Sequence, residues 1–431
     1  MAGAMTAMAE DASAIFHNPA GMVGQKGTQI QLVGSIFIPN IEFFRRPVID
    51  PNDPNMNEIR FDSITNSSGP GVAPYLGVVS DLGSKKMAVG AALTVPFGAA
   101  ISYPADGSQR HVITAVDLKA IHLSAAAAYK VTEAFRFGVS VNYILSEIKL
   151  EQGNAIPFVT GDPETFPEPD PGLEGDTLLE GHDTFSLSAT LGALYVDPKG
   201  RFNVGVSALT PVTLEMKGDA NVTNSAITPL LDGDGNEIQP GGQRHDEISV
   251  KIPLPLILRA GVMVKPHDRV KVAFDVNWQR WSVNKQLVID FKNEHELLPT
   301  PGAELIDVIV ENQWKDTFSV RLGTEVQPIA DNPFRVRGGV LFDQSPIDDQ
   351  HFDLLAPDSD KVGVSIGIGH VLSVGKSAKL ELDLVYQHLF FAERNVSDSA
   401  KTILNKPAPS FYNGVTRTRF DLVYIAAGLR L

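Results

Sequence analysis

The lengths of the links between strand-like segments constrain this sequence more than any other feature. Apolar and polar residues alternate with a period of two in stretches such as 270–279, 334–343 and 378–391. This period is typical of strands with one apolar and one polar face. Fourteen such segments lie near residues 28–38, 72–82, 86–98, 119–130, 135–150, 183–196, 201–217, 245–265, 269–283, 311–327, 334–343, 361–372, 378–391 and 416–431.

The links between these segments are alternately short and long. Short links lie near 83–85, 131–134, 197–200, 266–268, 328–333 and 373–377, and the long links between them reach beyond 30 residues near 39–71 and 151–182. An outer-membrane barrel has short turns at one end, long loops at the other and an even number of strands. We therefore predict an all-β fold, a transmembrane antiparallel β-barrel of about fourteen strands. The alternative is a soluble propeller or solenoid, and the missing repeat of about 40 residues counts against it.

Composition excludes several other classes of protein. The chain has 431 residues with 36 basic and 51 acidic side chains, and its net charge of −15 argues against a nucleic-acid partner. Cysteine is absent, which excludes thiol catalysis, cysteine-based zinc sites and disulfides. No run approaches the roughly 20 apolar residues of a transmembrane helix, so only a closed barrel could cross a membrane. No signal peptide is visible after Met1, and export has to be inferred from the body of the sequence.

Motifs for catalysis or metal binding are faint. Residues 232–236 alternate oxygen ligands like the start of a calcium loop, but the glutamate expected at the twelfth position is a glycine. A polar turn is the expected structure there. The sequence offers no serine nucleophile beside its His-Asp pairs. We predict no catalytic residue, no metal site, no cofactor and no enzyme activity.

Several motifs follow one another along the chain. Small residues over 2–16, which predict one or two helical turns, lead into Phe16, His17, Asn18, Pro19, Ala20 and Gly21. WQRW at 278–281, WKDTF at 314–318 and VRGGVLFDQSP at 336–346 come later. In this order the motifs resemble those of the FadL/TodX family of outer-membrane transporters for hydrophobic compounds, and the N-terminal segment resembles that family's hatch. The resemblance runs over most of the chain.

This resemblance implies a hatch over residues 1–27 inside a fourteen-stranded barrel over residues 28–431 of the bacterial outer membrane. It also implies passive uptake of hydrophobic small molecules, either long-chain fatty acids or aromatic hydrocarbons. The cargo would be captured between two external loops, pass to an apolar pocket and leave laterally beside a kinked third strand. The expected partners are such a ligand or a detergent, and outer-membrane lipid. We expect a monomer that binds no nucleic acid.

The third strand and two long loops carry candidates for these steps. Pro96, Phe97 and Gly98 stand in the third strand, where proline donates no hydrogen bond and glycine packs little, so a bulge or break is expected. An ordinary strand end at the external rim is the alternative. Exposed apolar residues in the loops 151–182 and 218–244 are candidates for ligand capture. They are Ile156, Phe158, Phe166, Leu178, Leu179, Ile227, Leu230 and Leu231.

Strand parity identifies candidates inside the barrel. Arg321, Arg335 and Arg337 alternate with apolar residues that would face lipid, so the arginines would face the lumen and could hold a carboxylate. Alternatively, they pair with lumen acids such as Glu381, Asp383 and Asp343. Phe420, Leu422 and Tyr424 share a face of the last strand and are further lumen candidates. We expect an interfacial aromatic girdle from Trp278, Trp281, Trp314, Phe390, Phe391, Phe411 and Tyr412.

Two other functions remain open at the level of the sequence. One is a barrel enzyme that acts on lipids. The other is a structural barrel or adhesin that uses its long acidic loops.

Overall fold

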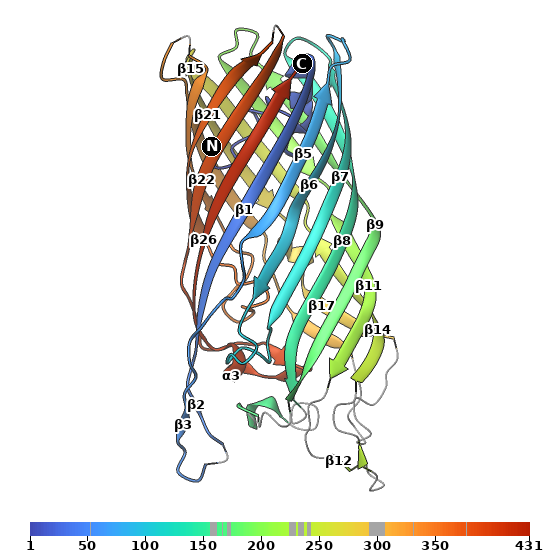
Figure 1. Cartoon of the computed structure of the whole chain (residues 1–431), viewed down its shortest axis with the longest axis vertical. Coiled ribbons are helices and arrows are strands. Elements are labelled where there is room, and N and C mark those ends of the chain that lie inside the picture. The colour runs from blue at the N-terminus through green and yellow to red at the C-terminus, as the bar shows by residue number, and fades with distance from the viewer. Residues whose placement is uncertain are drawn as a thin grey trace.

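In the computed structural model, fourteen antiparallel strands form a closed, elongated barrel (Figure 1). The barrel closes where β1 (Thr28–Arg45) pairs with β26 (Gly414–Arg430) along the whole length of both strands. The structure describes the chain except residues 52, 156–161, 166, 170–173, 224–229, 232–236, 239–242, 293–306, 331 and 376. For residues 230–231, 237–238 and 243–244 it describes the backbone only.

Each wall strand pairs with its neighbours in sequence, and four of the fourteen are interrupted. The uninterrupted strands between β1 and β26 are β5 (Gly71–Ser80), β6 (Met87–Ser102), β7 (Ala115–Lys130), β8 (Phe135–Ala155), β9 (Glu174–Val196), β20 (Phe334–Asp343), β21 (Lys361–Val374) and β22 (Ala378–Phe391). The interrupted ones are β10 (Phe202–Leu209) with β11 (Val212–Thr223), β14 (Gln243–Leu254) with β15 (Ile257–His267), β16 (Val270–Gln279) with β17 (Gln286–Phe291), and β18 (Val308–Glu311) with β19 (Thr317–Val326).

Short elements decorate the links and the N-terminal segment. They are α1 (Ala14–His17), η1 (Pro19–Gly24), β2 (Val48–Ile49), β3 (Glu58–Ile59), β4 (Ile64–Thr65), η2 (Pro163–Thr165), β12 (Leu230–Leu231), β13 (Glu237–Ile238), η4 (Trp281–Val283), β23 (Arg394–Val396), β24 (Thr402–Ile403), β25 (Lys406–Pro407) and α3 (Pro409–Tyr412). None of the helices among the described residues has the length and apolar character needed to cross a bilayer.

The predicted fold class and number of wall strands are confirmed, but some boundaries were wrong. Leu178 and Leu179 do not lie in a loop, because β9 begins at Glu174 and pairs with β8 and β11 at this level. This part of the strand was assigned to a loop because outward residues such as Glu180 are charged. The one or two helical turns predicted over residues 2–16 correspond to α1, a single turn that covers Ala14–His17.

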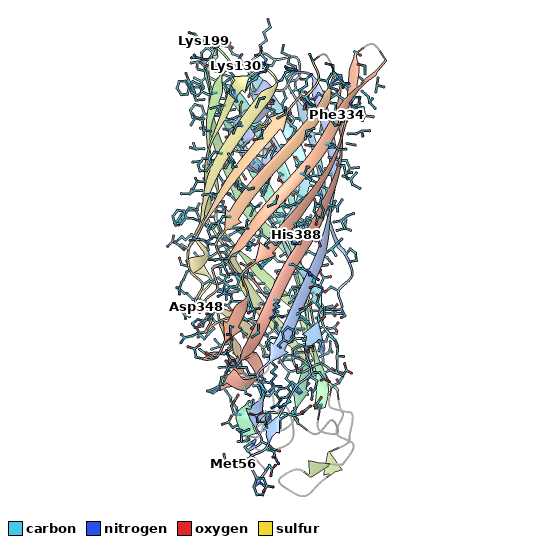
Figure 2. All side chains as sticks on the ribbon, turned by 90° about the vertical axis from the view of Figure 1, so that its left-hand side faces the viewer. Met56, Lys130, Lys199, Phe334, Asp348 and His388 are labelled. Carbon is cyan, nitrogen blue, oxygen red and sulfur yellow. The ribbon has the colours of Figure 1, made fainter. Side chains whose placement is uncertain are left out.

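The two ends of the barrel differ in their connections. Lys130 and Lys199 mark the end with short turns, and Met56 lies beyond the opposite end (Figure 2). We call these the short-turn end and the long-loop end.

A belt of apolar side chains covers the outside of the barrel near the short-turn end. On β8, the outward Phe135, Phe137, Val139 and Val141 are each 40–50% exposed, and the outward face becomes charged from Glu147 onward. Aromatic pairs mark the two edges of this belt, with ring centroids 5.2 Å apart for Phe135 and Tyr195 and 5.8 Å apart for Tyr143 and Phe185. Aromatic girdles at both edges of an apolar band are typical of outer-membrane barrels.

Most of the aromatic residues predicted for this girdle lie elsewhere. Phe390 is 57% exposed on the outer face, but Phe411 and Tyr412 are buried among the external loops. Trp281 turns into the lumen because η4 interrupts its strand, and its ring centroid lies 5.3 Å from that of Trp314 and 6.4 Å from that of Phe97. Phe391 packs on the inward Phe420 at 5.1 Å.

Loops fold into the barrel at the long-loop end and form a cap. Phe352, Leu354, Ile403 and Phe411 are almost fully buried against inward side chains of the wall. Lys401, whose side chain is 1% exposed, holds this cap together: its Nζ lies 3.2 Å from Asp353 Oδ2 and donates a 3.4 Å hydrogen bond to Asn312 Oδ1.

We expect Lys401→Ala to destabilise the cap by about 3–5 kcal/mol, because it leaves a buried carboxylate without its cation. Surface Lys315→Ala, which removes an exposed ion pair with Asp348, should cost at most about 1 kcal/mol. Proteolysis of the links 344–360 and 392–413 in the folded barrel measures both. Equal protection of the two variants would contradict a stabilising role for the buried pair.

Candidate functional site in the barrel lumen

The N-terminal segment packs against inward residues of the wall from Met1 to Gln25. Asp275 of β16 accepts hydrogen bonds at Oδ2 from the backbone amides of Met5 (2.9 Å) and Thr6 (2.8 Å). The buried Asn18 joins the segment to itself and to the wall, because its Nδ2 donates to the carbonyl oxygens of Thr6 (2.8 Å) and Ala193 (3.1 Å). Pro19 then opens η1, a position where a missing amide hydrogen costs nothing.

Inward glycines let the wall approach this segment closely. A Cβ on Gly138 would collide with the backbone of Pro19 and Ala20, and a Cβ on Gly205 would meet the Thr6 carbonyl group. Glycine inside a strand often marks such a close approach of another backbone. The same relation holds for Gly90, Gly192, Gly261, Gly323 and Gly339, whose added Cβ would meet residues of the N-terminal segment.

Toward the long-loop end, the lumen is lined by buried polar side chains. Asn142 accepts from Ser124 Oγ (2.8 Å) and Ser140 Oγ (3.0 Å), and donates to Ser188 Oγ (3.1 Å) and Thr190 Oγ1 (3.4 Å). We call this layer the polar band. Across the lumen, the polar band continues with Asn277, Ser319 and the residues described next.

Two guanidinium groups belong to the polar band, one on a buried arginine and one on a partly buried arginine. Arg259 is 8% exposed and lies over the ring of Phe16 at 5.0 Å, and its Nη1 is buried without a hydrogen-bond partner. Arg321 contacts Gly3, and its buried Nε also has no partner. The two flank β16, because Arg259 pairs in register with Asn277 and Arg321 with Asp275. Neither forms an ion pair at contact distance with a described residue, although the Asp275 carboxylate interacts electrostatically with both.

Beyond the polar band, the inward side chains become apolar. The order repeats on separate strands: Gly138, Ser140, Asn142 and Ile144 follow one another on the inner face of β8. Gly261, Arg259 and Ile257 do so on β15. We call this outer layer the apolar band, and it is continuous with the cap.

The other predicted lumen residues have diverse environments. Arg335 and Arg337 face the lumen but are paired: Arg335 Nη1 donates to Glu381 (2.7 Å), and Arg337 contacts Glu325 (2.7 Å), Glu381 (3.1 Å) and Asp383. These pairings correspond to the alternative expected from the sequence. Phe420, Leu422 and Tyr424 share the inner face of β26, where Leu422 is buried and Phe420 packs against the apolar band.

The ladder between β5 and β6 is interrupted in mid-wall. The two strands pair from Ser80↔Val89 to Leu76↔Leu93 and no further, although β6 continues to Ser102. At the far side of the interruption, Ser102 exchanges hydrogen bonds with Ser67 and Ser68. We call the unpaired stretch, residues 69–75 facing 94–101, the window.

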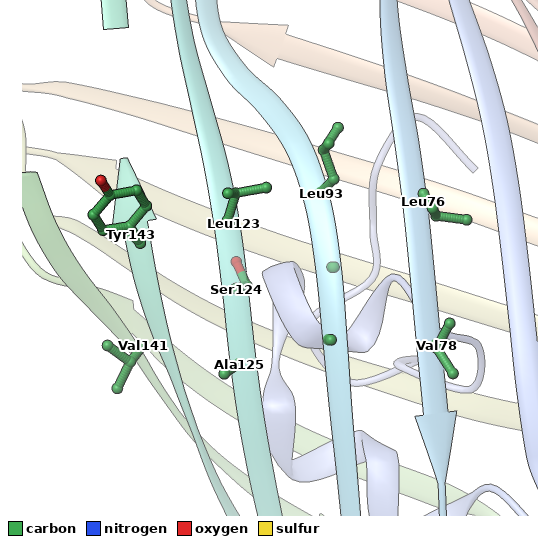
Figure 3. A pocket seen from close by; sticks show the side chains of 10 residues that line it. Leu76, Val78, Leu93, Leu123, Ser124, Ala125, Val141 and Tyr143 are labelled. Carbon is green, nitrogen blue, oxygen red and sulfur yellow. The ribbon is translucent and has the colours of Figure 1, made fainter. Parts of the chain in front are cut away.

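A β-bulge bends β6 at the window. Thr94 pairs with His122 and Phe97 with Ala120, so Val95 and Pro96 together oppose one residue of β7. A bulged strand bends, and Figure 3 shows β6 curving away from β5 beyond Leu93. Because β6 extends past Gly98, an ordinary strand end at this point is excluded. Phe97 faces the lumen, with its ring centroid 6.1 Å from that of the buried His122.

An apolar groove of about 500 Å³ lies on the wall next to the window (Figure 3). It runs across the outer face of β5, β6, β7 and β8 and includes the last β5–β6 pair. The side chains that define it are Leu76, Val78, Leu93, Leu123, Val141 and Tyr143.

Several predicted capture residues lie outside the described residues. They are Ile156, Phe158, Phe166 and Ile227, and the same holds for the loop 232–236. Leu230 and Leu231 form β12, and only their backbone is described. Leu179 is buried in the apolar band.

Sequence reasoning missed Arg259, Pro74 and the inward glycines. Pro74 stands on the β5 edge of the window, facing the bulge with Pro96 on β6. The sequence did contain signals for Pro74 and for the glycines. Two neighbouring predicted strands each contain a proline, and in five or more strands the glycines occupy positions that face the same side of the sheet. Arg259 follows a continuous apolar stretch, so the alternation of apolar and polar residues does not show which side of the sheet it faces.

A closed barrel with an apolar outer belt and an internal segment defines an outer-membrane channel. The chain belongs to the outer membrane protein transport protein family (OMPP1/FadL/TodX), whose model matches residues 1–417. This family consists of transport channels, and the protein is located in the bacterial outer membrane.

Relatives and solved structures agree with this assignment. The chain is 21% identical over 404 residues to the long-chain fatty acid transport protein of Escherichia coli K12, covering 89% of this chain and 83% of that protein. It is 23% identical over 430 residues to outer membrane protein P1 of Haemophilus influenzae, with 93% and 86% covered. The fold resembles a Pseudomonas aeruginosa FadL homologue (TM-score 0.77, 17% identity, 99% and 95% covered) and the P. putida toluene transporter TodX (0.65, 17%, 97% and 94%).

The glycines predict where the N-terminal segment can be displaced. Gly205→Val should push Thr6 off the wall at a cost of about 1–3 kcal/mol, as overpacking does, while the barrel ladder stays intact. Gly338→Val is a matched control, because the nearest atom to its added Cβ is 3.8 Å away. Protease accessibility of residues 1–27 and heat-modifiable migration of the barrel measure the two effects. Loss of the barrel itself in Gly205→Val would contradict the prediction that the N-terminal segment can be displaced while the wall stays folded.

Proposed function

We propose that this protein takes up long-chain fatty acids passively across the outer membrane. The observation that carries the proposal is a pair of guanidinium groups at the edge of an apolar band, the buried Arg259 and the partly buried Arg321, whose Nη1 and Nε atoms respectively are buried without a hydrogen-bond partner among the described residues. Burying a cation without a partner costs several kcal/mol. A carboxylate ligand would remove this cost through charge-assisted hydrogen bonds.

The order of the lumen layers supports an amphiphilic cargo over a plain hydrocarbon. The apolar band would hold an acyl chain, and the polar band would hold the head group against the N-terminal segment. A purely apolar molecule gains nothing from buried hydroxyl, amide and guanidinium groups. The aromatic cluster of Phe97, Trp281 and Trp314 favours aromatic hydrocarbons as a second class of cargo, because flat rings stack on such side chains.

We further propose that residues 1–27 act as a hatch and that the cargo leaves through the window into the membrane. The window lacks ladder hydrogen bonds, and the apolar groove next to it lies on the lipid-facing surface. Transfer of an acyl chain into the bilayer is favourable by the hydrophobic effect, so no energy source is needed.

Replacing the arginines tests the head-group site. Arg259→Met and Arg321→Met should each lower fatty-acid affinity about tenfold or more, since a hydrogen bond to a charged group contributes about 1.5–3 kcal/mol. Affinity for an alkane of equal length should not change. Arg335→Met is the control, because Glu381 keeps Arg337 and Arg430 as partners. Isothermal titration of the purified barrels measures the affinities. Unchanged fatty-acid affinity in both arginine variants would overturn the proposed cargo.

Deleting Pro96 tests lateral release. The deletion removes the bulge, leaves Val95 opposite one residue of β7 and keeps every other β6 side chain on its face. Uptake by cells should fall to a small fraction, while binding to the purified barrel persists. Deleting Thr184 is the matched control, because it removes a similar register shift between β8 and β9, away from the window. Normal uptake by a Pro96 deletion with a regular third strand would rule out this exit.

A further inference from the structure

Tyr75 connects the N-terminal segment to the edge of the window. It is the first residue of β5 beyond the last β5–β6 pair, Leu76↔Leu93. Its side chain faces the lumen, and its Oη donates a 2.6 Å hydrogen bond to the carbonyl oxygen of Ala12. Beyond Leu76, β5 is held by β1 alone, so this side-chain bond acts on a strand edge with one partner.

Gly77 makes room for this bond. The Tyr75 ring lies over Gly77, and a Cβ at that position would come within 2.8 Å of the ring atoms Cε1 and Cζ. Any larger residue at position 77 would therefore displace the ring and separate its hydroxyl group from Ala12. The role of glycine at this position is to leave space for the Tyr75 ring, and not to form a turn.

The same part of the N-terminal segment also touches the opposite strand. Ile15 and Met22 pack at Gly90 of β6, where an added Cβ would lie 2.9 Å from Ile15 Cδ1 and 3.2 Å from Met22 Sδ. They form one apolar cluster with Ala88 and Ala92 of β6. The segment thus bridges β5 and β6 at the short-turn side of the window.

We propose that Tyr75 is a positioning residue that couples the hatch to the window. The hydrogen bond to Ala12 keeps the free β5 edge in place while the hatch is seated. When the hatch moves, the bond breaks and the edge is released, so the exit opens together with the hatch. This inference rests on the proposed function of the hatch and window.

Two variants break the tether in different ways. Tyr75→Phe removes the hydroxyl group and keeps the ring, and Gly77→Ala keeps the hydroxyl group and moves the ring. Tyr143→Phe is the matched tyrosine control, because its hydroxyl group donates to Thr184 on the outer wall. Gly34→Ala is the matched glycine control, since its added Cβ has no neighbour within 4 Å.

The first measurement follows the hatch directly. In a full-length chain carrying Ser13→Cys as its only cysteine, maleimide should label position 13 several-fold to about tenfold faster in both tether variants, in keeping with the loss of one hydrogen bond. The two controls should label at the parent rate. Parent-like labelling in both Tyr75→Phe and Gly77→Ala would overturn the tether.

The second measurement separates coupling from a purely structural role. Fatty-acid affinity of the purified barrels should stay within about twofold of the parent, because the polar band is untouched, while uptake by cells should rise in parallel with labelling. Faster labelling with parent-like uptake would overturn the coupling. Labelling does not depend on the cargo, so a failure of the arginine variants to affect binding would reject the proposed cargo without deciding the tether.

Discussion

Backbone hydrogen bonding in lipid is the constraint on which the rest of this structure depends. An unpaired amide or carbonyl group in hydrocarbon costs several kcal/mol, so a sheet can cross a membrane only when it closes on itself. The β1–β26 ladder provides this closure along both strands. Closure also divides the side chains into two populations, because successive residues face the lipid and the lumen in turn. The belt, the glycines and the two lumen bands all occupy positions that this parity assigns.

The window departs from this constraint, and its sequence reduces the cost. Pro74 and Pro96 stand on its two edges, and proline has no amide hydrogen to leave unpaired. The opening is also bounded, by Leu76↔Leu93 on one side and by the hydrogen bonds of Ser102 on the other. A short interruption with fewer unpaired amide groups costs less free energy than a strand edge that is unpaired along its whole length. The N-terminal segment lies on the lumen side of the window's short-turn boundary, where Tyr75 and Gly90 contact it.

Parity explains why much of this architecture could be predicted from the sequence. The period of two located the wall strands, and the same alternation placed Arg321, Arg335 and Arg337 inside the barrel. What parity could not supply was the identity of partners far away in the chain. Whether an inward arginine contacts an acid, as Arg337 does, or keeps a buried nitrogen without a partner among the described residues, as Arg321 does, depends on neighbouring strands and on residues 1–27. The cap was missed for the same reason: Phe411 and Lys401 belong to links, and only tertiary contacts bury them.

The relative height of the window and the lumen bands constrains the order of release under the proposed function. Thr94, at the short-turn boundary of the window, pairs with His122, which is level with Ile144 where the apolar band begins. Ile101, near the opposite end of the window, pairs with Val116 of the apolar band. Most of the window therefore faces the apolar band. An acyl chain lying there would be next to the opening while its carboxylate remained on Arg259 and Arg321. The chain can then enter lipid first, and the growing hydrophobic gain offsets the cost of detaching the charged head last. A head-first exit would have to carry the carboxylate past apolar side chains without any such gain, so the layered lumen favours release by the tail.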